Sequence, residues 1–298
     1  MESTPSIVAA RLFVLRSATL VRSRLKVSSM FTFSTFAGVL IATRGDSSIE
    51  VLTLAPLSTF LICLSVYLLN DLFDLDTDKI NAPNRPLATQ AATKNEALVL
   101  VLLLGGLGTG LGFVLGFWPF VITLLEIVLG VLYSVKPFNF KDRFLVKTLS
   151  ICAGGVLANL LGGIASGVVN LDLLFCSTLF GVFIFSTSPI NDLADYVGDK
   201  SQNRKTIPIV IGPKKTVLLS IFTSIAPPIS ALVLFEILSF NPLSIVLLSV
   251  TALWALRLLL PLERKPLVNF ATVRKSHSRM LYLHFLLQVA LVVGSLTL

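Results

Sequence analysis

The sequence predicts an all-helical integral membrane protein with nine membrane-spanning helices. Of its 298 residues, 54% are hydrophobic and only 13% are charged, about half of the charged share of a typical soluble domain. The mean hydropathy is +0.87, and long apolar runs recur along the whole chain. Most side chains must therefore face lipid rather than water, which excludes an ordinary water-soluble enzyme.

Each predicted span is an apolar run of 17–21 residues, close to the ~20 residues that cross a ~30 Å hydrocarbon layer. Turn-forming pairs such as Trp118-Pro119 and Asn241-Pro242 separate runs that would otherwise fuse. Runs this long and continuous indicate helices rather than barrel strands, because lipid offers no hydrogen-bond partner to an open backbone. The spans are predicted at residues 27–43, 51–69, 97–116, 119–135, 148–168, 171–190, 216–236, 243–262 and 280–298.

The basic residues segregate to one side of this arrangement. With nine spans, the loops after spans two, four, six and eight lie on the same side as the N-terminus, and 22 of the 24 Lys and Arg residues fall on that side. Arg44 lies on the opposite side, and Arg257 lies inside span eight. A miscounted span would scramble this segregation. It indicates a cytoplasmic face for the basic loops and explains the net charge of +8 without nucleic acid.

The chain divides into an N-terminal segment, residues 1–26, and a single domain, residues 27–298. The segment carries several Arg and Ser residues and a single acid, Glu2, a composition that organellar transit peptides share. Because it is short and has no clear cleavage signal, we expect an interfacial helix leading into the first span. Three isolated cysteines in apolar stretches are expected to be packing residues: Cys63, Cys152 and Cys176.

Two acidic motifs repeat each other at the ends of spans two and six. Residues 70–79 read NDLFDLDTDK and residues 191–200 read NDLADYVGDK. Both match N-D-L-x-D-x-x-x-D-K, and each is followed by a basic, turn-rich segment. The pattern indicates two pseudo-repeats within the single domain. Because both motifs follow even-numbered spans, they are expected to meet at the same membrane face.

The spacing of the acids favours a metal-bound diphosphate. Intervals of three and four residues would place the three acids of each motif on one helix face, with Asp76 pointing elsewhere. Acids beside a membrane span are costly and are candidates for function. Their hard oxygen ligands suit Mg²⁺, which completes its coordination shell with water and phosphate. Zn²⁺ is disfavoured because the two histidines, His277 and His284, are remote from both motifs, and we interpret them as packing or interfacial residues.

The alternative, that these acids are merely solvated helix ends, is disfavoured because two near-identical copies lie on the same side. A third polar segment follows span four on that side. There Tyr133 and Ser134 offer hydroxyl groups, while Lys136 and Lys141 offer positive charge to a phosphate. The sequence therefore predicts a site where carboxylates hold Mg²⁺ and basic side chains neutralise a diphosphate.

These motifs resemble those of the UbiA superfamily of intramembrane prenyltransferases, over nearly the whole chain. The likeness extends to the phrases NRPL at 84–87 and RKTIP at 204–208, and to Tyr133 and Ser134 with Lys141. The stretch 88–90, Ala-Thr-Gln, departs from the Ser-Gly turn of many members, which concerns the lid and leaves the metal residues unchanged. The resemblance implies a helical bundle around a central cavity, two Mg²⁺ ions and a cytoplasmic active-site face.

The resemblance also implies a role for each matching position. The implied metal site comprises Asn70, Asp71, Asp74, Asp78, Asp192, Asp195 and Asp199. Within it, Asn70, Asp74, Asp195 and Asp199 would be direct ligands. The implied catalytic residues are Asp74, Asp195, Lys141 and Tyr133, and the implied substrate-binding residues are Asn70, Arg85, Ser134, Lys141, Arg204 and Lys205.

The implied reaction transfers an isoprenyl group from a prenyl diphosphate to a lipophilic acceptor within the membrane. The wording of the motifs is most similar to members acting on geranylgeranylglyceryl phosphate or on aromatic quinone precursors, and less to haem O synthases. A terpene cyclase of the same superfamily stays open, because both reactions begin with the same ionisation. A transporter of an anionic lipid or a metal is disfavoured, since the acids lie at helix ends and not at the bilayer midplane.

Overall fold

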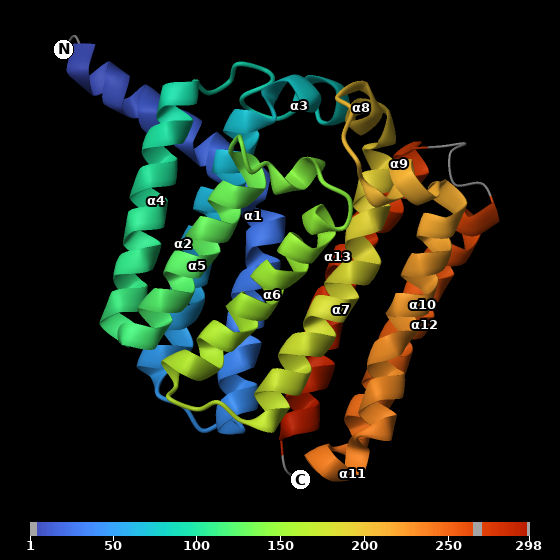
Figure 1. Ribbon diagram of the computed structural model, residues 1–298. Coiled ribbons are helices and arrows are strands. Elements are labelled where there is room, and N and C mark those ends of the chain that lie inside the picture. The colour runs from blue at the N-terminus through green and yellow to red at the C-terminus, as the bar shows by residue number, and fades with distance from the viewer. Residues whose placement is uncertain (1–4, 265–269, 297–298) are drawn as a thin grey trace.

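The computed structural model of the protein describes residues 5–264 and 270–296. Within these residues, nine helices are long and apolar enough to cross a membrane, and they stand side by side as a bundle (Figure 1). They follow the nine predicted spans in order, so the predicted fold class is confirmed. Their bounds are α1 (Pro5–Thr43), α2 (Ile49–Phe73), α4 (Lys94–Leu115), α5 (Phe117–Ser134), α6 (Val146–Ala165), α7 (Leu171–Ala194), α10 (Pro213–Val233), α12 (Pro242–Arg264) and α13 (Phe270–Ser295).

Five short helices occupy the connections between the long ones. Four of them lie at the end of the bundle where the acidic motifs are found, and α11 lies at the opposite end (Figure 1). The short helices are α3 (Leu75–Asn81), η1 (Phe140–Asp142), α8 (Tyr196–Ser201), α9 (Ile207–Ile211) and α11 (Phe235–Leu238).

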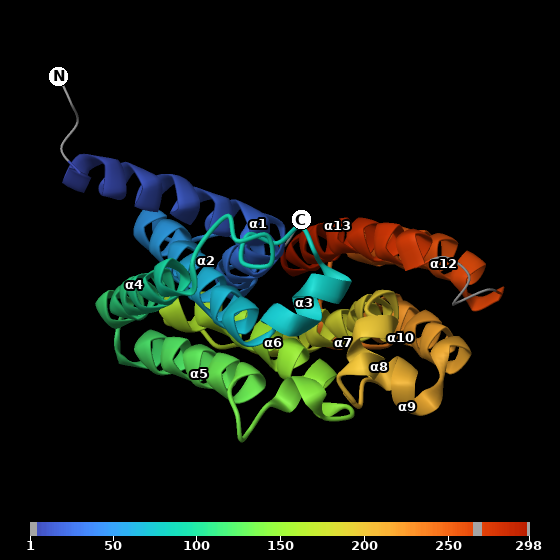
Figure 2. The same ribbon diagram turned by 90° about the horizontal axis from the view of Figure 1, so that it is seen from above.

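The first and last long helices begin earlier than the apolar runs predicted. Helix α1 has 39 residues, about 58 Å at 1.5 Å per residue, and its N-terminal turns project away from the bundle (Figures 1 and 2). Helix α13 begins at Phe270 instead of residue 280. The apolar runs mark only the lipid-buried parts, and neither 6–26 nor 270–279 contains a Gly or Pro that would stop a helix. The interfacial placement of 1–26 stays a prediction, and its first four residues lie outside the described ones.

Six of the long helices form a ring, and Figure 2 shows the bundle from above. Helix α1 packs against α2, α6 and α13, while α7 packs against α6, α10 and α13. Helices α4, α10 and α12 lie outside this ring, where they cover α2, α7 and α13. The ring helices α1, α2, α5, α6, α7 and α13 supply the membrane-buried walls of the site described below.

Small residues and polar contacts hold the ring together. In lipid, apolar burial drives helix association weakly, so close backbone approach and interhelical hydrogen bonds carry more of it. A Cβ added to Gly162 of α6 would meet the backbone of α1 at Thr35 and Val39. Nearby, the Asn159 amide donates to the Ser34 carbonyl at 2.9 Å and accepts from the Ser177 hydroxyl at 2.7 Å. Asn159 thus joins α1, α6 and α7 inside the membrane.

We expect Gly162→Ala to destabilise the protein by about 1–3 kcal/mol, the usual cost of overpacking, because the methyl group pushes α6 away from α1. Gly106→Ala is the matched control, because a Cβ there meets nothing within 4 Å and alanine favours the helix. Thermal unfolding of both variants in detergent measures the difference. Equal unfolding temperatures would contradict the close approach of α1 and α6.

Candidate active site

Each acidic motif interrupts its helix at the second aspartate. Helix α2 ends at Phe73 and α3 begins at Leu75, with Asp74 between them at φ −101° and ψ 8°. Asp195 separates α7 from α8 in the same way, at φ −98° and ψ 7°. The prediction that each motif forms one continuous helix face is therefore wrong. Asp competes with the helix backbone for hydrogen bonds and is a weak helix former, and both aspartates are instead engaged by basic side chains.

The break turns the second half of each motif over the end of the bundle. Helices α3 and α8 contact each other there (Figure 2). Gly198 of α8 faces the side chain of Asn81 of α3 so closely that a Cβ at 198 would overlap with it. The two motifs, 121 residues apart in sequence, thereby form a roof from two short helices.

A cavity of about 420 Å³ lies beneath this roof. Its walls come from the six ring helices, and its upper end includes α3, Arg85, Lys141, Asp199 and Arg204. The upper end is charged, whereas the deeper walls are largely apolar and include Ile62, Val66, Leu129, Ile151, Ile184 and Leu281. The cavity is thus suited to a molecule with a charged head and an apolar chain.

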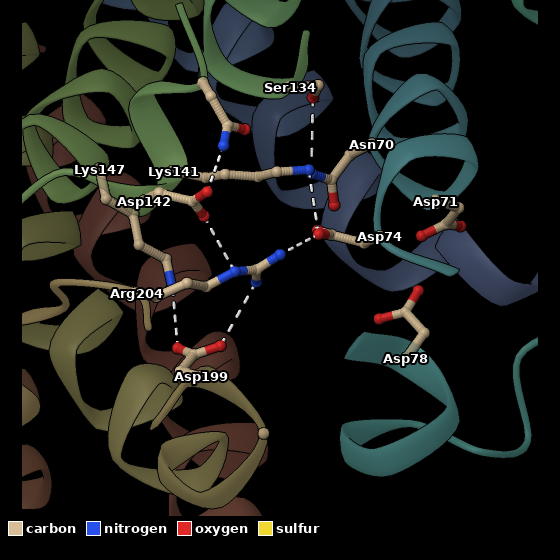
Figure 3. A network of polar contacts seen from close by, with 12 residues as sticks. Asn70, Asp71, Asp74, Asp78, Ser134, Lys141, Asp142, Lys147, Asp199 and Arg204 are labelled. Carbon is tan, nitrogen blue, oxygen red and sulfur yellow. Dashed lines mark hydrogen bonds and ion pairs between the residues drawn. The ribbon is translucent and has the colours of Figure 1, made fainter. Parts of the chain in front are cut away.

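Asp74 contacts two basic side chains of the site (Figure 3). It pairs with Lys141 at 2.9 Å and also with Arg204. Asp71 pairs with Arg24 and, at 3.1 Å, with Arg85. The Asn70 amide lies 3.5 Å from the Ser134 hydroxyl.

The remaining first-motif acids separate into one inside and one outside the cavity. Asp78 pairs with Arg85 and is 6% exposed, so it is buried within the site. Asp76 is exposed and pairs with Lys79 at 3.0 Å, which confirms that it points away from the other acids. Only the former faces the cavity.

The second motif is paired as thoroughly as the first. Lys147 lies 2.7 Å from Asp192 and 3.4 Å from Asp199. Arg204 reaches Asp199 at 3.3 Å in addition to Asp74, so it joins the two motifs directly (Figure 3). Asp195 accepts from Arg274 at 2.7 Å and from the Asn191 amide at 3.2 Å.

Outside the membrane-spanning helices, burial and ion pairs together shift the pKa of the acids. Burial raises the pKa of Asp74, but the opposing charges of Arg204 and Lys141 are stronger and leave it below its ordinary value. Burial raises the pKa of Asp199 above its ordinary value, although Lys147 and Arg204 oppose it. Burial also lowers the pKa of Lys141 in spite of Asp74. Asp74 is therefore an ionised carboxylate, whereas Asp199 takes up a proton more readily.

The structure brings most of the expected site residues to one cavity. Its walls include Asn70, Asp74, Asp78, Arg85, Tyr133, Lys141, Asp192, Asp195, Asp199 and Arg204. Asp71 and Ser134 are buried behind the wall and contact residues that line it. Lys205 is exposed and absent from the cavity walls; it instead places its backbone N–H 3.0 Å from the Asp142 carbonyl.

Several residues at the site were not among the expected ones. In the sequence, Lys147 and Arg24 indicate only which side of the membrane the basic segments face. In the structure, both line the cavity and pair with motif acids. Asp142 forms an ion pair with Arg204, with its Oδ1 2.9 Å from the Arg204 Nε, and Asn191 occupies the place in its motif that Asn70 has in the other. The similarity of the two motifs could have identified Asn191. Six acids near lipid also require several cations, which could have drawn attention to Lys147.

The two histidines are not remote from the motifs, so that prediction was wrong. Helix α13 packs against α1 and α7 and brings His277 and His284 to the cavity wall. Their separation in sequence concealed this, because it is long-range packing that joins α13 to the site. The His284 Nε2 lies 3.0 Å from the Thr187 hydroxyl. Within 5–264 and 270–296, no three His, Cys, Asp or Glu side chains form a ready-made metal cluster.

Comparisons with known proteins agree with this geometry. A family model described as the UbiA prenyltransferase family matches residues 31–293. The digeranylgeranylglyceryl phosphate synthase of Thermococcus sibiricus is 34% identical over 199 residues, which are 65% of this chain and 68% of that protein. The same enzyme of Pyrococcus furiosus is 33% identical over 61% of this chain and 65% of that protein.

Solved structures show the same fold. A structure of a digeranylgeranylglyceryl phosphate synthase superposes with a TM-score of 0.72 at 22% identity, over 96% of this chain and 99% of that one. A UbiA homologue from Archaeoglobus fulgidus, bound to GPP and Mg²⁺, gives 0.70 at 18% identity, over 93% of this chain and 99% of that one. With nine helices able to cross a membrane among its described residues and a family match over most of its length, the chain is a multi-pass membrane protein that belongs to the UbiA prenyltransferase family.

Proposed function

We propose that the protein transfers an isoprenyl group from a prenyl diphosphate to a lipophilic acceptor, with Mg²⁺ as cofactor. The observation that carries this proposal is the convergence of two acidic motifs on the charged end of a cavity whose deeper walls are apolar. A prenyl diphosphate has the same division between charge and hydrocarbon. The membership in the UbiA prenyltransferase family supports the same reaction.

The donor set is chemically suited to two Mg²⁺ ions. We assign Asn70 and Asp74 to one ion and Asp195 and Asp199 to the other. These are oxygen ligands of the kind that Mg²⁺ prefers. A buried Asp192 oxygen, Oδ2, has no hydrogen-bond partner among the described residues, so the site has acceptor capacity beyond its ion pairs. The A. fulgidus homologue was solved with Mg²⁺ and, separately, with Cd²⁺.

The ion pairs of the acids indicate what must change when substrate binds. Asp74 holds Lys141 and Arg204, and Asp199 holds Arg204 and Lys147. When bound, Mg²⁺ would neutralise the carboxylates and polarise the phosphate oxygens. The three basic side chains are then free to turn from carboxylate to phosphate. The acids of the site therefore hold in place the cations that we assign to phosphate.

The remaining walls are suited to a carbocation. As the bond between the allylic carbon and the diphosphate oxygen breaks, Lys141, Lys147 and Arg204 stabilise the departing negative charge. The buried cavity excludes water from the cation. The rings of Phe31, Tyr67 and Tyr133 line it and offer π faces to positive charge.

The acceptor class follows from the relatives. The two named above are digeranylgeranylglyceryl phosphate synthases, so we assign to this chain a lipid acceptor with a glyceryl phosphate head. Its hydroxyl oxygen forms the new bond to the prenyl carbon, diphosphate leaves, and the hydroxyl proton is released. Asp71, Asp78 and Asp192 have a supporting role, because each holds a basic side chain in position.

The site lies on the side that holds the basic loops. The roof helices, η1 and α9 occupy one end of the bundle (Figure 1), and 22 of the 24 basic residues belong to the segments on that side. Because such residues accumulate on the cytoplasmic face, we assign the active site to the cytoplasmic or equivalent face of its membrane.

We expect Asp74→Ala and Asp195→Ala each to reduce turnover at least 100-fold, the order of effect of losing one electrostatic group at the reacting centre. Chelation of divalent metal by EDTA should abolish it, and added Mg²⁺ should restore it. Asp76→Ala is the matched control, because this exposed acid of the same motif pairs only with Lys79 among the described residues. Release of diphosphate by purified protein measures all of these. Full activity of the Asp195→Ala variant would contradict the proposed metal site.

Single cysteines test the sidedness. We expect Lys94→Cys and Lys214→Cys to react with a membrane-impermeant thiol reagent from one side of sealed vesicles, and Asp46→Cys only from the other. Wild-type protein is the control, because its three cysteines all lie within membrane helices. Labelling of Asp46→Cys and Lys94→Cys from the same side would contradict the membrane crossing by α2 that separates the two positions.

The dependence on acceptor separates transfer from cyclisation. We expect purified protein with geranylgeranyl diphosphate and Mg²⁺ alone to give little product, because productive ionisation requires an acceptor positioned against the cation. Addition of the lipid acceptor should give a prenylated ether, detected by mass spectrometry. Efficient formation of a cyclic terpene without acceptor would make the protein a cyclase of the same fold.

A further inference from the structure

Among the described residues, one basic side chain of the cavity has no acidic partner. Of the basic residues that line it, Arg24, Arg85, Lys141, Lys147 and Arg204 each pair with at least one aspartate. Lys26 of α1 lines the same cavity but forms no ion pair with a carboxylate in the described part of the chain. Its positive charge is therefore available to a ligand.

Neutral groups hold Lys26 in place instead. Its ammonium donates to the Ser278 carbonyl at 2.7 Å and to the Ser278 hydroxyl at 2.8 Å. It also lies 4.1 Å from the centroid of the Tyr282 ring. All three contacts come from α13, so the ammonium is fixed at the junction of α1 and α13. An ammonium has three donors, and two are used here, which leaves one for an anion.

This position is across the cavity from the cations assigned to diphosphate. Lys141 belongs to η1, Lys147 begins α6, and Arg204 precedes α9. Seen from above, α1 and α13 lie side by side on the other edge of the ring (Figure 2). His277 of α13 is one of the polar residues that line this wall.

Apolar wall continues from Lys26 into the membrane. Val27, Met30 and Phe31 follow it on α1, and Leu281 follows His277 on α13, and all four line the cavity. Met30 and Phe31 lie about one helical turn deeper than Lys26. A cation above an apolar surface suits an anionic lipid whose tail runs down into the bilayer.

We propose that Lys26 binds the phosphate of the acceptor, so that the acceptor is a lipid phosphomonoester held on the α1 and α13 side of the cavity. This assignment rests on the proposed function and specifies its second substrate. The two anionic groups then occupy opposite edges of one cavity, where Lys26 binds the acceptor phosphate and Lys141, Lys147 and Arg204 bind the diphosphate. This separation of the two phosphate-binding edges keeps the acceptor's phosphate out of the diphosphate site. The acceptor's hydroxyl group then lies between the two edges.

The test compares Lys26→Gln with wild type on two acceptors, geranylgeranylglyceryl phosphate and its phosphate-free alcohol. Loss of one charge-assisted hydrogen bond predicts a rise of about tenfold or more in KM for the phosphorylated acceptor. The KM for prenyl diphosphate and the activity on the alcohol should stay within twofold. Lys26→Arg should restore most of the affinity. Lys214→Gln removes the same charge from the same end of the bundle, outside the cavity, and should match wild type.

A direct binding titration of both acceptors in detergent keeps this test separate from the reaction itself. Weaker binding of the phosphorylated acceptor alone to Lys26→Gln supports the site even if wild type transfers no prenyl group, an outcome that would overturn only the proposed reaction. Equal binding by wild type and Lys26→Gln would overturn the phosphate site. An equal rise in KM for prenyl diphosphate would overturn it too, because Lys26 would then belong to the diphosphate site.

Discussion

Charge compensation at the cavity roof is the constraint on which the rest of the structure depends. Asp71, Asp74, Asp78, Asp192 and Asp199 are buried within the protein, and an uncompensated buried carboxylate costs several kcal/mol. Asp74 and Arg204 neutralise each other, and their ion pair connects the end of α2 to the segment before α9. Lys141 adds η1 to the same cluster. The loops that form the roof are therefore positioned by the groups that are suited to bind substrate.

The membrane-spanning helices are held together by contacts that differ from the ion pairs of the roof. Between the helices, contacts such as Gly162 against α1 and Asn159 between α1 and α7 depend on close approach and hydrogen bonding. The outer helices α4, α10 and α12 complete the bundle without reaching the cavity. The reactive end can thus change its ion pairs on binding, while the packed ring below holds the walls at a fixed spacing.

Hydropathy and motif spacing predicted the number and order of the spans because both are local properties of the chain. The meeting of Asp74 with Asp199 could also be expected, since both motifs follow even-numbered spans. The helix breaks at Asp74 and Asp195 could not, because a spacing of three and four residues is equally compatible with an unbroken helix. The place of His277 at the cavity depends on how α13 packs against α1 and α7. That packing is a long-range property with no signal in the neighbouring residues.

The contact between α3 and α8 also restricts how the sequence can diverge. Residue 198 has room only for hydrogen beside the side chain of Asn81. A larger residue at 198 would displace the Asn81 side chain unless residue 81 becomes smaller, so the two positions are coupled. The two acidic motifs are thus coupled to each other through a pair of residues that carries no charge at all.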